Sequence, residues 1–224
     1  VHEYLTCEEA KTEEFLPGPR IIYRHDGARA RDPDAYRKDA ALLEQALRDE
    51  PDNTRYTFYL AQSYRDAGEL ELAIKSYRRR AAMKGWDEEI WQSYYQIAEV
   101  QQRLTLPWAE VMESYLTAFQ FKPDRAEPLY HLGMHYQHKA QYHISHLYFS
   151  RAMKIPEPPS SRLFVESNIY QHLLPLEYAV ACYWLGDHRK AIEVNNRLLQ
   201  EGKLPAQLVE LVVKNRQFSL DALS

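Results

Sequence analysis

Apolar and polar positions recur at helical spacing on both sides of a glycine in the stretch YTFYLAQSYRDAGELELAIKSYRRRAA. The small residues Ala61 and Ala73 allow two helix backbones to approach closely, and the large rings of Tyr64 and Tyr77 fill the space beside them. Gly68 lies between the two helical segments and permits the positive φ that ends a helix. The pattern therefore predicts a hairpin of two antiparallel helices.

The same pattern of small and aromatic residues recurs three more times along the chain. It resembles the tetratricopeptide repeat (TPR), a helical hairpin with a period of 34 residues. From Ala61 to Gly133 is 72 residues, so one repeat with four extra residues fits between them. From Gly133 to Ala179 is 46 residues, so about 12 are inserted there, among them the proline-rich IPEPPSSR. The matching positions of the later copies are Trp91, Tyr94, Tyr95, Ala98, Tyr115, Ala118 and Pro123, then Leu132, Gly133, Tyr136, Ala140, Phe149 and Ala152, then Ala179, Gly186 and Ala191.

The repeats predict an all-α fold, a right-handed TPR-type α-α superhelix with a short N-terminal extended segment. Stacked repeats bury their apolar faces only against neighbours, so atypical capping elements are expected at both ends. Pro175 is expected to kink or break the helix that starts near Leu163. An ordinary helical bundle with chance spacing is the alternative. The predicted boundaries are 1–33 for an N-terminal segment and 34–224 for the repeat domain, with a half-repeat at 35–51, repeats at about 54–85, 88–123, 126–156 and 163–204, and a capping helix at 205–217.

The first thirty residues follow a different pattern. The stretch PGPRIIYRHDG predicts a short strand, Arg20 to His25, bounded by turn residues. A single strand is not stable alone, so it docks on the helices or belongs to a further domain. The order of VHEYL, a strand ending in HDG, a helix rich in Arg and Lys, and then repeats resembles bacterial proteins that join a family 2 glycosyltransferase domain to C-terminal TPRs. His2, Glu3, His25 and Gly27 match that family's HE pair and later H-x-G motif.

The resemblance implies a parent enzyme that uses a nucleotide-sugar donor and a divalent metal held by an Asp-x-Asp motif. The only such match, Asp32–Pro33–Asp34, lies in the linker and is interpreted as a helix N-terminal cap. This chain is therefore expected to hold no cofactor and to be an accessory region without catalysis of its own. His2, Glu3 and His25 are either remnants of the enzyme's acceptor or metal side, or loop and strand-end residues without a role. A stand-alone TPR adaptor is the alternative, and a catalytic chain is a third reading.

Composition narrows the class of partner. The chain has 28 basic and 32 acidic residues, a net charge of −4, whereas nucleic-acid binding normally needs a basic excess. No apolar stretch reaches the length of a membrane-spanning helix. Cys7 and Cys182 are too few for a secreted disulfide framework, which favours reduced thiols and a cytoplasmic location. We therefore expect a protein or peptide partner, or self-association, and neither nucleic acid nor a membrane span.

Five histidines crowd the third hairpin. His131, His135 and His138 follow helical spacing and share one face, and His143 and His146 lie on the next helix. Such a set could bind zinc or nickel. However, the hairpin lacks an acidic residue to orient a ligand ring. A solvated or partly packed face is therefore the other reading, and the first three histidines are only weak metal candidates.

The remaining candidate site is the concave groove that the first helix of each hairpin lines in this fold. A mixture of amides, aromatic rings and both charge signs suits an extended peptide or a partner helix. The alternative is that these residues only solvate the groove. No catalytic residue is assigned, because the chain has neither a glycine-rich phosphate loop nor a nucleophile elbow. By repeat register the groove residues are Arg55, Phe58, Gln62, Arg65, Gln92, Gln96, Tyr130, Met134, Gln137, Tyr183 and Trp184.

Overall fold

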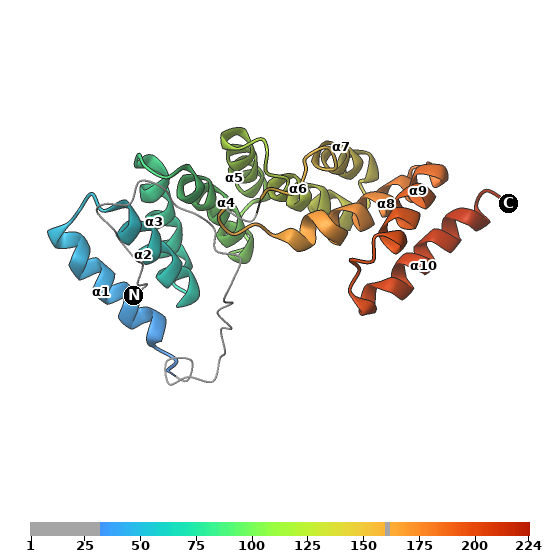
Figure 1. Ribbon diagram of the computed structural model, residues 1–224. Coiled ribbons are helices and arrows are strands. Elements are labelled where there is room, and N and C mark those ends of the chain that lie inside the picture. Colours follow the sequence, from blue (N-terminus) through green and yellow to red (C-terminus); the bar gives the residue numbers. More distant parts are fainter. Residues whose placement is uncertain (1–31, 160–161) are drawn as a thin grey trace. The chain divides into compact units, whose positions relative to one another are not determined.

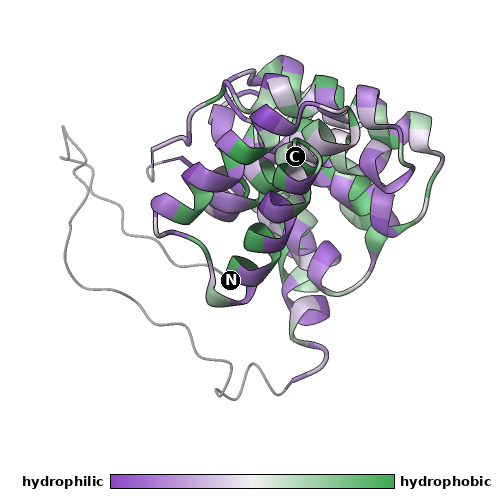
Figure 2. Ribbon diagram, turned by 90° about the vertical axis from the view of Figure 1, so that its right-hand side faces the viewer, coloured by the Kyte–Doolittle hydropathy of each residue, from purple (hydrophilic) through white to green (hydrophobic). Residues whose placement is uncertain are grey.

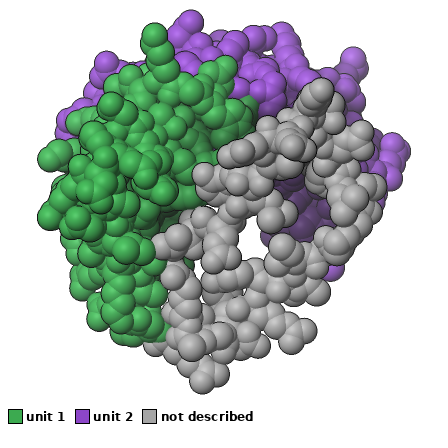
Figure 3. All heavy atoms as spheres, turned by 60° about the vertical axis from the view of Figure 1, so that its left-hand side comes forward, with its two compact units in different colours: residues 1–106 green, residues 107–224 purple. Residues whose placement is uncertain are grey.

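The computed structural model describes residues 32–159 and 162–224, and every regular element in these ranges is helical (Figure 1). The chain divides into two compact units, residues 1–106 and 107–224, which are coloured separately in Figure 3. The expected strand from Arg20 to His25 lies outside the described residues.

Unit 1 is a row of antiparallel helices in which each helix packs against the next. The second helix of the row also touches the fourth, so the first helices of two successive hairpins lie on the same side. The helices are α1 (Ala35–Asp49), α2 (Thr54–Asp66), α3 (Leu70–Ala82) and α4 (Asp87–Arg103).

Unit 2 repeats this arrangement. Consecutive helices pack together from α5 to α10, and α6 touches α8 while α8 touches α10. The first helices therefore form one side of the unit, as in unit 1. The elements are α5 (Trp108–Phe121), α6 (Glu127–His138), α7 (Tyr142–Ala152), η2 (Ile169–Leu173), α8 (Leu174–Trp184), α9 (His188–Gln200) and α10 (Ala206–Asp221).

Small residues set the distance between paired helices. Ala61 and Ala73 are fully buried where α2 meets α3. In the third hairpin, a Cβ built on Gly133 would lie only 2.3 Å from Cε1 of Phe149, so α6 and α7 approach too closely there for any side chain. These contacts leave polar residues on the outer faces, and Figure 2 shows hydrophilic and hydrophobic positions alternating around the helices.

Every first helix in the described hairpins ends in the same backbone motif. The residue after the helix has positive φ: +81° at Gly68, +53° at Thr105, +54° at Ala140 and +78° at Gly186. The next amide N–H then reaches back five residues to a helix carbonyl, for example from Gln141 to Tyr136 at 2.9 Å. This is the Schellman motif, which satisfies carbonyls left open at a helix end. The four turns therefore share one geometry although only two of them contain glycine.

The start of α1 differs from the expected cap. Asp34 is the N-cap residue of α1, but its side chain makes no capping hydrogen bond. The carboxylate of Asp32 instead accepts the backbone N–H of Asp34 at 3.0 Å and the ammonium group of Lys38 at 2.6 Å. The local Asx turn of Asp32 thus replaces the predicted cap.

The segment before α8 also differs from the expectation. Helical backbone begins at Ser167, not near Leu163. The carbonyls of Leu163 and Phe164 accept the Arg125 guanidinium at 3.2 and 3.4 Å, and Phe164 has a φ of +47°. Pro175 does not break the helix: the π-helical turn η2 leads directly into α8. A proline lacks an N–H and crowds the preceding turn, and a wider π turn accommodates both defects.

Candidate functional site

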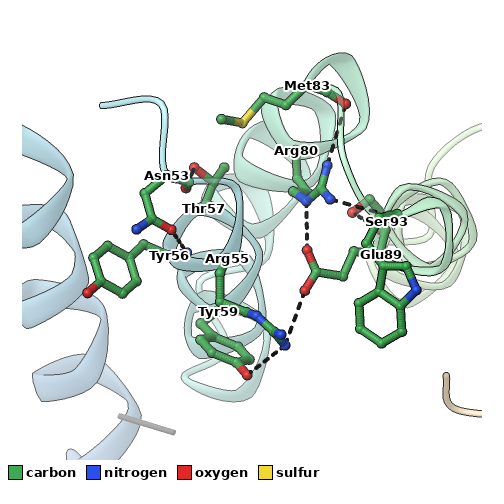
Figure 4. A network of polar contacts seen from close by, with 10 residues as sticks. Asn53, Arg55, Tyr56, Thr57, Tyr59, Arg80, Met83, Glu89 and Ser93 are labelled. Atoms are coloured by element: carbon green, nitrogen blue, oxygen red, sulfur yellow. Dashed lines mark hydrogen bonds and ion pairs between the residues drawn. The ribbon is translucent and has the colours of Figure 1, made fainter. Parts of the chain in front are cut away.

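A buried ion pair organises the first-helix face of unit 1 (Figure 4). Arg80 is fully buried, and its Nε donates to Oε2 of Glu89 at 3.0 Å. Its other nitrogens donate to the carbonyls of Met83 and Trp86 at 3.5 and 3.4 Å. Breaking such a pair on one side leaves an uncompensated buried charge and costs roughly 3–5 kcal/mol. This network therefore fixes the end of α3 against the start of α4.

Two of the predicted groove residues of unit 1 connect α2 to α4. Arg55 lies 3.4 Å from the second carboxylate oxygen of Glu89 and donates to the Tyr59 hydroxyl at 3.3 Å. Arg65 donates to Oε1 of Gln96 at 2.9 Å. These polar groups already bind one another across the face, which limits what they can offer a partner.

Two other predicted groove residues of unit 1 are core residues. Phe58 is 2% exposed, and its ring meets that of Tyr77 edge-on with centroids 6.3 Å apart. Gln92 is 4% exposed, and its Oε1 has no hydrogen-bond partner among the described residues. Both side chains point toward the neighbouring helix of the stack and not toward a groove. Gln62 is half-buried.

The middle of the first-helix face in unit 2 is also largely packed. Gln137 donates to the Glu177 carboxylate and accepts the Ser145 hydroxyl at 3.2 Å, so it connects α6 to α7 and α8. Burial raises the pKa of the Glu177 carboxyl, against the opposing effect of the hydrogen bond from Gln137. Burial likewise raises the pKa of Tyr130 to about 12. Met134 is half-buried.

The last two predicted groove residues, Tyr183 and Trp184, line an open cavity. It has a volume of about 300 Å³ and lies between α8, α9 and α10. Trp184 is 57% exposed and Phe218 on α10 is 46% exposed. Aromatic rings exposed on this scale at a concave site are typical of binding surfaces. Three lining residues were not predicted from the sequence: Asn195, Asn215 and Phe218.

The histidines of the third hairpin do not form a metal site. Within residues 32–159 and 162–224, no three His, Cys, Asp or Glu side chains are grouped to hold a metal ion. His131 stacks on Tyr115 with ring centroids 5.3 Å apart, and His135 stacks on Trp108 at 3.4 Å. His138 is exposed. Because the rings pack against different neighbours, their nitrogens do not converge on one point.

The other chemically reactive candidates offer no active site. Cys182 is buried on α8, and burial raises the pKa of its thiol to about 11, so it is almost entirely protonated at neutral pH. His2, Glu3 and His25 lie outside the described residues. Among the helices that the structure describes, none is both long and apolar enough to cross a membrane.

Comparison with known proteins shows the fold. No protein-family model and no curated protein matches this chain. Among solved structures, it is similar to the C-terminal part of a TPR repeat-containing protein from Cytophaga hutchinsonii, with a TM-score of 0.63 and 11% identity over 85% of this chain and 67% of that one. MamA gives a TM-score of 0.52 with 14% identity over 90% of this chain and 96% of its own. PilF of Pseudomonas aeruginosa gives 0.53 with 19% identity over 88% and 90%.

These similarities confirm the predicted fold class. At such low identity they support the architecture alone. The chain has the all-α fold of a TPR-type α-α solenoid.

Proposed function

We propose that this chain is a protein-interaction scaffold that binds a partner segment on the first-helix face of unit 2. TPR-type folds are stacks whose surfaces suit extended peptides and helices. The observation that carries the proposal is the aromatic cavity, where Trp184 and Phe218 expose 57% and 46% of their surfaces. Exposed aromatic side chains beside a cavity supply the anchor points that dominate protein interfaces.

Recovery of partners from the source cell tests this proposal with matched variants. Trp184→Ala and Phe218→Ala remove exposed rings from the cavity. Leu147→Ala removes a 65% exposed apolar side chain from α7, a second helix of the same unit. All three should keep the wild-type helical circular dichroism. Partners held by the wild type and Leu147→Ala but lost from the other two support the proposal. Equal recovery by all forms would rule it out.

Self-association is the alternative partner class. Light scattering across a concentration series would show it as a mass above that of the 26.5 kDa chain. A mass that rises with concentration and returns to one chain in Trp184→Ala would place a second copy at the cavity. The absence of a nucleic-acid partner and the cytoplasmic location stay predictions.

The glycosyltransferase parent is a second proposal. It is favoured by the order of His2, Glu3, His25 and Gly27 ahead of the repeats. Such a parent would bring the nucleotide-sugar donor and the divalent metal, while this chain would present the acceptor or a partner. The coding sequence upstream of Val1 tests it: a further domain of about 200 residues with an Asp-x-Asp motif is expected. A coding sequence without such a domain leaves the stand-alone adaptor.

A further inference from the structure

The cavity of unit 2 is built by three helices. Tyr183 and Trp184 contribute from α8, Asn195 from α9, and Asn215 and Phe218 from α10. The volume of about 300 Å³ lies at the small end of the range for ligand sites, which suits one large side chain better than a cofactor.

Neighbouring rings fix the aromatic walls of the cavity. Tyr183 meets Trp184 edge-on, with centroids 5.4 Å apart and an interplanar angle of 79°. The centroid of Phe218 lies 6.3 Å from that of Tyr183. Tyr142 stacks on Trp184 at 5.2 Å, which holds the exposed indole ring in place. A flat apolar guest would therefore meet rings that are already oriented.

One lining group lacks a partner. Asn195 is 1% exposed, and its Oδ1 has no hydrogen bond among the described residues. A buried acceptor without a donor is costly, so an occupant that brings a donor is favoured over one that does not. The terminal torsion of an asparagine side chain is soft, and a small rotation can turn Oδ1 toward the cavity.

The charges around the cavity select a neutral guest. The lining residues that the structure describes are apolar, aromatic or amide in character. The ammonium group of Lys214 lies 5.8 Å from the Phe218 centroid and would repel a cationic side chain. A carboxylate would lose its hydration to a lining without a cationic side chain, which is unfavourable.

We propose that this cavity binds a tryptophan side chain of a partner protein, whose indole N–H donates to Oδ1 of Asn195 while its ring packs among Tyr183, Trp184 and Phe218. The inference rests on the proposed scaffold function and names its ligand. Tryptophan combines a flat apolar ring with a single N–H donor and no acceptor, which matches the one unpaired acceptor of the site. Phenylalanine and leucine lack the donor, and arginine adds the charge that the site disfavours.

Titration of the full chain with Ac-Gly-Trp-Gly-NH2 and Ac-Gly-Phe-Gly-NH2 tests the inference. Amide and indole resonances of the ¹⁵N-labelled protein would report the site of binding. We expect the tryptophan peptide to shift the Trp184 indole and Asn195 side-chain signals, and to bind about fivefold more tightly than the phenylalanine peptide, the ratio of one neutral hydrogen bond. Asn195→Leu should bring that ratio to about one while keeping phenylalanine binding. Phe218→Ala, at an exposed position, should weaken both peptides.

Three results would overturn the inference: no shift at the cavity, equal affinity of the wild type for the two peptides, or a preference that survives Asn195→Leu. If Asn195→Leu does not fold, the wild-type ratio and Phe218→Ala still decide. Failure of the scaffold proposal looks different. Partner recovery that depends on Trp184 without tryptophan binding would overturn the ligand and keep the scaffold, whereas peptide binding with unchanged partner recovery would do the reverse.

Discussion

The turn of the third hairpin offers a substitution whose effect depends on one backbone angle. Ala140 has a φ of +54°, at the place where Gly68 and Gly186 have +81° and +78°. A left-handed conformation costs an alanine about 1–2 kcal/mol. Glycine adopts it freely but loses roughly 0.5–1 kcal/mol more backbone entropy on folding. Ala140→Gly should therefore stabilise the protein by about 0.5–1 kcal/mol.

Thermal unfolding followed by circular dichroism measures this change. A domain of this size shifts by about 2–4 °C per kcal/mol, so Ala140→Gly should raise Tm by about 1–4 °C. Gly186→Ala is the matched reverse. A Cβ there would meet nothing within 4 Å, so the added methyl group acts only through the backbone. It should lower Tm by a similar amount.

A local readout guards against unfolding in several steps, which repeat arrays can show. The amide of Gln141 donates to the Tyr136 carbonyl in this turn, so its hydrogen exchange reports the stability of the motif. Exchange should slow in Ala140→Gly. A lower Tm with faster exchange in that variant, or an unchanged Tm in Gly186→Ala, would refute the conformational argument.

Three further substitutions test the packing and the buried charges. Gly133→Ala should destabilise by roughly 1–3 kcal/mol in a thermal melt, because the new methyl group would overlap the Phe149 ring. Glu89→Gln should cost about 3 kcal/mol in urea unfolding, because it leaves the Arg80 charge buried without its counter-charge. Glu177→Gln should reduce the pH dependence of stability. Since burial raises the folded pKa of Glu177, the folded state holds its proton longer, and stability falls as pH rises from the unfolded pKa through the folded one.

Each of these has a control or a contrary result. Arg37 and Glu69 form an exposed pair, so Glu69→Gln should change stability by less than about 1 kcal/mol. Equal costs of Glu69→Gln and Glu89→Gln would contradict the role of burial. Gly133→Ala without loss would mean that the Phe149 ring moves aside freely. A Glu177→Gln variant whose stability still falls with pH as in the wild type would show that another group dominates.

The sequence predicts the hairpins well because their determinants are local. Small residues and turn positions recur at fixed offsets, so even Ala140 could be assigned to a turn without its glycine. The expected cap at Asp34 was wrong for a related reason: Asp32 offers a competing Asx turn two residues earlier. Local chemistry allowed both arrangements, and the spacing alone could not decide between them.

The face that each side chain presents was harder to predict. Counting along α2 places Phe58 and Gln62 on one stripe, yet Phe58 packs against Tyr77 of α3 and is buried. The width of the buried stripe depends on how closely the partner helix approaches, which the sequence of one helix does not specify. The cavity shows the same limit, since Asn195 and Phe218 come from helices far apart in sequence and no short motif joins them.

The two units divide the chemistry of the first-helix face in a way that bears on function. In unit 1, Arg55 and Arg65 are committed to Glu89 and Gln96, so a partner would have to replace existing contacts at an equal cost. In unit 2, the exposed rings of Trp184 and Phe218 lose only water on binding. Affinity at protein interfaces comes mainly from a few aromatic anchors, while polar contacts around them set orientation. The binding energy of this scaffold should therefore be concentrated at the α8–α10 cavity.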